Sequence, residues 1–148
     1  FFSLTNLTIS PQTVDVRNNS EQFTVTVSAT DDDSGLQKAW LWLESPSGSG
    51  NVNTFATFDG SLSNTTTWSP SIGMWSEPGD WYFKYFWIYD VTGNIKKYSK
   101  DDLSGLGFPN KISVTSNTDS TLAYIILVIL ILYCFYFSSV LLVNYELS

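Results

Sequence analysis

The chain has 148 residues, enough for one domain of ordinary size or for a smaller domain with an appendage. With 14 acidic residues, 7 basic residues and a net charge of −7, it repels nucleic-acid backbones, so we expect no nucleic-acid partner. It has no histidine and one cysteine, which excludes Ser-His-Asp and Cys-His nucleophiles, histidine-ligated zinc and four-cysteine metal sites.

Residues 1–116 consist of short strand-like runs separated by turn residues. Thr, Ser, Val and aromatic residues fill the runs, and Gly, Pro, Asn and Asp lie between them. The clearest run, residues 22–30, alternates polar and apolar side chains, which is typical of a strand with one buried face. The residues of this run that we expect in the core are Phe23, Val25, Val27 and Ala29.

Two further runs, residues 38–44 and 81–89, are apolar on both faces, so we expect them to be central strands. Weaker strand candidates are residues 4–10, 13–17, 52–58, 65–69, 94–98 and 111–115. Eight or nine short strands with turn signals between them predict an all-β fold with two antiparallel sheets packed as a sandwich. A barrel is the lesser possibility.

Four short motifs follow one another along these runs. They are ATDDDSGL at residues 29–36, SPSG at 45–48, PGDW at 78–81 and YDVTGN at 89–94. In this order they resemble the pattern of extracellular bacterial Ig-like repeats, over about residues 3–116. The resemblance implies an immunoglobulin-like antiparallel β-sandwich over residues 1–116. It also implies a place among several such modules in a surface adhesin, or an accessory role in a secreted hydrolase.

Acidic residues follow two of the predicted strands. If residues 23–30 and 81–89 are strands B and F of such a sandwich, their carboxyl ends lie at one pole. Carboxylate and amide oxygens there are the ligands that Ca²⁺ prefers. The predicted metal site consists of Asp31, Asp33, Asp90 and Asn94, and its cofactor is structural calcium. The alternative is that these side chains only form Asx-turns, because the spacing is not that of an EF-hand.

A second feature is a set of aromatic residues with a common strand parity. Trp40 and Trp42 share parity with Lys38 and Glu44, and Tyr82, Phe86 and Ile88 share parity with Lys84. If the charged residues face outwards, the aromatic ones line one outer sheet face, where they could stack sugar rings or pack a neighbouring subunit. The ligand-binding residues that we expect are Trp40, Trp42, Tyr82 and Phe86. The alternative is the opposite register, with Trp40 or Trp42 in the core.

Residues 122–143 form a run of 22 residues without a charge. As a helix this run would be about 33 Å long, matching a hydrocarbon core of roughly 30 Å. We therefore predict a single transmembrane helix there, after a linker at residues 117–121 and before a short tail at 144–148. A buried strand or core helix at 123–133 and a reading-frame error after Thr121 are the alternatives. The tail has no Lys or Arg, so charge gives no orientation from that side.

These features together predict a non-enzymatic structural or adhesion module on the cell surface. We expect it to be extracytoplasmic and single-pass, anchored in the membrane by residues 122–143, with neighbouring Ig-like domains or surface glycans as partners. A small sandwich offers loops, whereas acid–base catalysis needs carboxylates paired in a cleft, so we expect no enzyme. Two alternatives stay open: a carbohydrate-binding accessory module that uses the aromatic sheet face, and a ligand-free spacer repeat of a larger surface protein.

Overall fold

The computed structural model describes residues 2–117, 128–131 and 133. The chain divides into two units, Phe1–Asn117 and Thr118–Ser148, and each is described by itself. In the second unit, residues 128–131 and 133 are helical. None of the helices in the described part of the chain has both the length and the apolar character needed to cross a membrane. Most of the span predicted at 122–143, and all of residues 118–121 and 144–148, lie outside the described residues.

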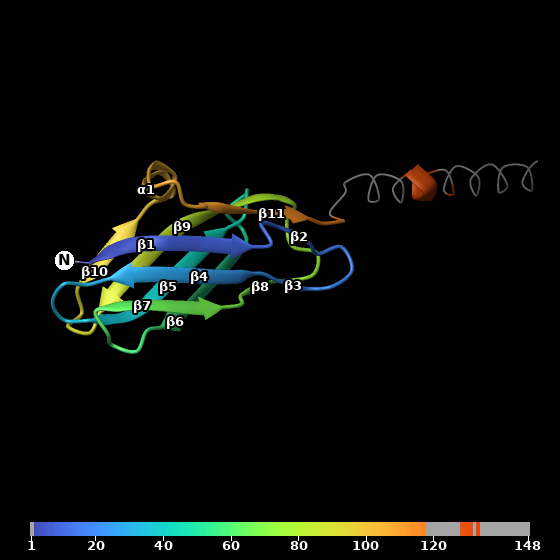
Figure 1. Cartoon of the computed structure of the whole chain (residues 1–148). Coiled ribbons are helices and arrows are strands. Elements are labelled where there is room, and N and C mark those ends of the chain that lie inside the picture. The colour runs from blue at the N-terminus through green and yellow to red at the C-terminus, as the bar shows by residue number, and fades with distance from the viewer. Residues whose placement is uncertain (1, 118–127, 132, 134–148) are drawn as a thin grey trace, which may run out of the picture. The chain divides into compact units, whose positions relative to one another are not determined.

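The smaller of the two main sheets has three antiparallel strands in the order β1-β4-β7 (Figure 1). They are β1 (Ser3–Ser10), β4 (Thr24–Thr30) and β7 (Ser63–Trp68). In β4 every second side chain is buried, as its alternating sequence predicts. On the other face, hydroxyl groups pair across the strands, as between Thr26 and Thr67, whose Oγ1 atoms are 3.0 Å apart.

The larger sheet has six strands, five of them in the order β2-β11-β9-β5-β6 (Figure 1). These are β2 (Thr13–Asp15), β11 (Lys111–Thr115), β9 (Gly79–Asp90), β5 (Leu36–Glu44) and β6 (Asn51–Thr57). The sixth strand, β10 (Ile95–Tyr98), pairs with the second half of β9, while β11 pairs with the first half. All pairs are antiparallel except β2 with β11. The central position predicted for residues 38–44 and 81–89 is confirmed.

The inward faces of these two sheets share one hydrophobic core. Its largest fully buried side chains include Phe23, Phe83, Phe86, Leu41 and Leu43. All four core residues predicted from the first strand pattern, Phe23, Val25, Val27 and Ala29, are at most 1% exposed. The all-β, antiparallel character of the prediction is therefore confirmed. A separate short pair, β3 (Glu21–Gln22) with β8 (Ser71–Ile72), completes the strands of the described part.

One helix interrupts the strands, and the strand pattern did not predict it. Helix α1 (Lys100–Gly105) begins after Ser99, whose Oγ accepts a hydrogen bond from the Asp102 N–H at 3.2 Å. In return the Asp102 carboxylate accepts one from the Ser99 N–H at 2.8 Å, which completes a capping box. Leu103 is fully buried and fixes the helix on the core. The helix thus separates β10 from β11 along the side of β9.

Candidate functional site

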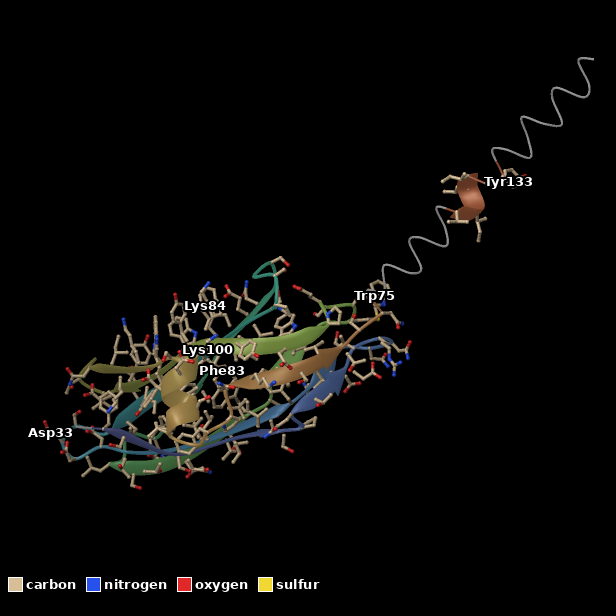
Figure 2. All side chains as sticks on the ribbon, turned by 90° about the horizontal axis from the view of Figure 1, so that it is seen from above. Asp33, Trp75, Phe83, Lys84, Lys100 and Tyr133 are labelled. Atoms are coloured by element: carbon tan, nitrogen blue, oxygen red, sulfur yellow. The ribbon has the colours of Figure 1, made fainter. Side chains whose placement is uncertain are left out.

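The aspartates predicted to meet at one pole do lie together. Asp31, Asp33, Asp90 and Asn94 line one depression of about 290 Å³, with Phe2, Ser34, Ile95 and Lys96 completing its wall. The two loops that carry them are joined where the Val91 N–H donates to the Gly35 carbonyl at 2.9 Å. Figure 2 shows Asp33 at one end of the β-rich unit and Trp75 at the other.

Hydrogen bonds within the loops already occupy the buried carboxylates of this pole. Asp90 accepts from the backbone N–H groups of Thr92 and Asn94 at 3.0 and 2.7 Å, and from Asn94 Nδ2 at 2.6 Å. Asp31 accepts from the N–H groups of Ser34 and Gly35 at 3.1 and 2.7 Å. Burial alone would raise the pKa of Asp90, but the bonds from Asn94 and Thr92 outweigh it and lower the pKa to about 2. The pKa of Asp31 is lowered in the same way, with burial opposed by the bonds from Gly35 and Ser34.

This bonding supports the alternative in which the aspartates form turns. The Asn94 side chain, predicted as an oxygen ligand, donates from Nδ2 to the Asp90 carboxylate at 2.6 Å. Within the described ranges, no group of three or more His, Cys, Asp or Glu side chains is placed to hold a metal ion. The structural calcium therefore stays a prediction that the described residues do not support.

On β5 the aromatic residues lie on the outer face, as their parity predicted. Ala39, Leu41 and Leu43 are fully buried, whereas Trp40 and Trp42 between them are partly exposed. The alternative register, with a tryptophan of this strand in the core, is wrong.

On β9 the predicted parity holds for Tyr82 and Lys84 and fails from Tyr85 onwards, so that Phe86 and Ile88 are buried. Trp42 is opposite Tyr85 and Leu43 is opposite Phe83, so Lys84 is an extra residue in a β-bulge. Lys84 and Tyr85 both point outwards, and from there on the parity is reversed. Phe86 is fully buried, which makes its prediction as a ligand-binding residue wrong.

Seven aromatic side chains form what we call the aromatic face, on the outer side of the larger sheet. They are Trp40, Trp42, Phe55, Tyr82, Tyr85, Trp87 and Tyr89. Ring centroids of six of them are linked in steps of 5.2–6.5 Å, from Phe55 through Trp40, Trp87 and Tyr85 to Trp42, with Tyr89 beside Trp40. Four of the seven were missed: Phe55 on the edge strand, where it is 57% exposed, and Tyr85, Trp87 and Tyr89 because of the bulge.

Five of the six lysines lie over these rings. Lys38 Nζ is 4.3 Å from the ring centroid of Tyr89 and 5.3 Å from that of Trp40, and Lys97 Nζ is 4.9 Å from that of Trp87. Lys84, Lys100 and Lys111 lie 5.2–6.0 Å from the centroids of Trp42, Tyr85 or Tyr82. These are cation–π distances.

Two of these lysines are paired with carboxylates. Lys84 Nζ is 2.5 Å from Glu44 and Lys111 Nζ is 2.6 Å from Asp80, and each carboxylate raises the pKa of its lysine. Lys38, Lys97 and Lys100 have no ion pair with any residue that the structure describes.

The aromatic face continues into two adjoining hollows along β9. One, of about 680 Å³, is lined by Tyr82, Lys84, Lys100 and Asp101 among others. The next, of about 490 Å³, is lined by Lys84, Tyr85, Trp87 and Lys97 and shares Lys84 and Ser99 with the first. Helix α1 contributes residues to both. Aromatic rings and lysine ammonium groups thus alternate along these two open hollows. The rings can stack on a flat apolar ligand surface, so the arrangement is suited to an extended ligand.

No family model and no curated protein matches the chain. Among solved structures, it is similar over 78% of its length to a β-glucosidase of Erythrobacter marinus, at 11% identity and a TM-score of 0.43. A β-glucosidase of Listeria innocua in complex with glucose gives 11% identity over 78% of the chain and a TM-score of 0.39. The chain covers 15% and 16% of the lengths of these two proteins. At such values the similarity supports no conclusion about this chain.

Proposed function

We propose that this chain is a non-enzymatic adhesion module of the cell surface, built as an immunoglobulin-like β-sandwich and held to a membrane by residues 122–143. The order β1-β4-β7 facing β2-β11-β9-β5-β6 supports this, because it corresponds to strands A-B-E and A′-G-F-C-C′ of an immunoglobulin-like domain. The charge-free run supports the anchor, and the resemblance of the four motifs to those of extracellular Ig-like repeats supports the extracytoplasmic location and neighbouring domains of the same kind.

The observation that carries the proposal is the aromatic face. Seven rings on the solvent side of a sheet lower solubility and add nothing to the core, so they favour a ligand surface over a spacer without a ligand. A carbohydrate-binding accessory module is the second candidate, because Trp and Tyr rings stack on the apolar faces of sugars. Both candidates use the same surface. Calcium is no part of either, because the loops already bond the buried aspartates.

A glycan array with the full chain in neutral detergent tests the proposal. We expect binding that Trp40→Ala and Trp87→Ala each reduce. Trp75→Ala is the matched control, because Trp75 is 63% exposed but makes no ring contact with the aromatic face. Equal binding by all three variants would show that the face is not the ligand surface. Binding to no glycan and to no cell surface would favour the spacer.

A further inference from the structure

One half of the aromatic face differs from the other in charge. The half that we call the lysine–aromatic cluster consists of Lys38, Trp40, Phe55, Trp87, Tyr89 and Lys97. In the other half, Glu44 and Asp80 neutralise Lys84 and Lys111, and Asp101 lines the hollow beside Lys100. In the lysine–aromatic cluster Asp102 lines the hollow beside Lys97, but neither Lys38 nor Lys97 has an ion pair within the described residues.

This absence is unexpected in so acidic a chain. With 14 acidic residues for 7 basic ones, every base could have a partner. Instead Lys38, from β5, lies over the rings of Trp40 and Tyr89, and Lys97, from β10, lies over the ring of Trp87, so the two lysines approach one group of touching rings from the strands on either side of β9. We propose that the lysine–aromatic cluster binds a polysaccharide in which uronate sugars alternate with neutral ones. This inference rests on the proposed function of the aromatic face and adds the charge of its ligand.

The cluster fits such a ligand in two ways. The Trp40 and Trp87 rings, with centroids 6.0 Å apart and planes at 66° to each other, offer two neighbouring apolar surfaces of different orientation for sugar rings. The two ammonium groups lie over rings, where a cation–π contact at an exposed site is weak. A uronate carboxylate gives each lysine a stronger, charge-assisted bond and draws it off the ring, which frees that ring for stacking.

Other extended ligands fit less well. A peptide strand adds to a sheet at an unpaired edge, whereas Trp40 and Trp87 lie on the middle strands β5 and β9, whose backbones are paired on both sides. A nucleic acid carries a charge at every phosphate, and a chain of net charge −7 repels it strongly. A polymer with a charge on alternate sugars meets the two lysines and suffers less of this repulsion.

The test measures binding of the full chain, in neutral detergent, to three immobilised polymers: hyaluronan, which alternates uronate with a neutral sugar, uncharged dextran, and single-stranded oligo(dT). We expect hyaluronan to bind best and to weaken with salt. The double variant Lys38→Gln with Lys97→Gln should lower the affinity of the chain for hyaluronan roughly tenfold, about the contribution of two partly exposed charge pairs. Lys96→Gln is the matched control, because it removes the same charge from the neighbouring residue, which lines the aspartate pole.

Each of the other outcomes overturns a defined part of the proposal. In one outcome dextran and hyaluronan bind equally well, Trp40→Ala reduces this binding, and the double lysine variant leaves it unchanged. That outcome would overturn the uronate inference and leave the proposed function standing. Stronger binding of oligo(dT) would overturn the polysaccharide in favour of a nucleic acid. Failure of all three polymers to bind, with glycans bound on the array, would overturn the inference alone, and failure to bind any glycan or any cell surface would overturn the proposed function as well.

Discussion

The carboxylate of Asp90 holds the loop after β9, and its bonds make that loop sensitive to acid. Its pKa is about 2 in the folded chain, below the ordinary value of 3.8, so the unfolded state binds protons more readily. The stability that these bonds contribute is complete above about pH 4 and is lost as the pH falls towards about 2. An asparagine at position 90 has an amide nitrogen in place of one carboxylate oxygen. That nitrogen cannot accept the hydrogen bond that Asn94 Nδ2 now donates.

We therefore expect Asp90→Asn to lower the melting temperature at pH 7 and to lose less further stability than the wild type between pH 4 and pH 2. Thermal unfolding followed by circular dichroism at several pH values measures both effects. Asp33→Asn is the control, since Asp33 lines the same depression but has no hydrogen bond among those of the described residues. If the two variants unfold alike at every pH, the loop bonds of Asp90 do not stabilise the pole.

The same bonds lead to an expectation for calcium. A cation at the pole would have to displace the N–H groups that now bond Asp31 and Asp90. We expect melting curves in EDTA and in millimolar Ca²⁺ to coincide, and differential scanning calorimetry can compare them. A gain of about 2.7 kcal/mol, the value for a ligand at 100 times its Kd, would instead establish the calcium site.

Among the elements, β4 and β9 show which features of a strand the sequence predicts and which it does not. The position of β4 and its buried face were predictable, because polar and apolar side chains alternate there. In β9 aromatic residues occupy both faces, so the sequence has no such contrast, and the bulge at Lys84 depends on pairing with β5 that is visible only in three dimensions. Trp40, Trp42 and Tyr82 were therefore placed correctly and Phe86 was not. Helix α1 did leave a signal, the capping-box residues Ser99 and Asp102.

The bulge also predicts an unusual tolerance to deletion. Without Lys84, β9 would alternate regularly, with Phe83 and Phe86 inward and Tyr85 between them outward. We expect a chain lacking Lys84 to stay folded and to lose only the exposed pair with Glu44, worth about 0–1 kcal/mol. A chain lacking Trp87 should unfold, because Ile88 would turn outwards. Near-ultraviolet circular dichroism distinguishes the two, and an unfolded Lys84 deletion would show that the strand needs its extra residue.

At the scale of the whole molecule, the first unit has its own core. Among the described residues, every member of that core lies between Phe2 and Val114, so these side chains of the unit pack against one another. We expect a chain cut after residue 118 to stay folded, with a far-ultraviolet circular dichroism spectrum dominated by strands. A spectrum dominated by helix, or a molten unit without cooperative melting, would show that residues 119–148 take part in the fold.

The chain direction in the larger sheet has a mechanical consequence. β2 runs parallel to β11, joined by the bond from the Val16 N–H to the Thr115 carbonyl at 2.8 Å and from the Ser113 N–H to the Gln12 carbonyl at 2.9 Å. Tension applied ahead of β2 and behind β11 pulls the two strands in opposite directions along their axes, so their hydrogen bonds carry the load together. Tension that peels β6 from the sheet edge breaks its bonds one after another. In single-molecule pulling, the first direction should require the higher force, which would let an adhesion module bear load along the chain.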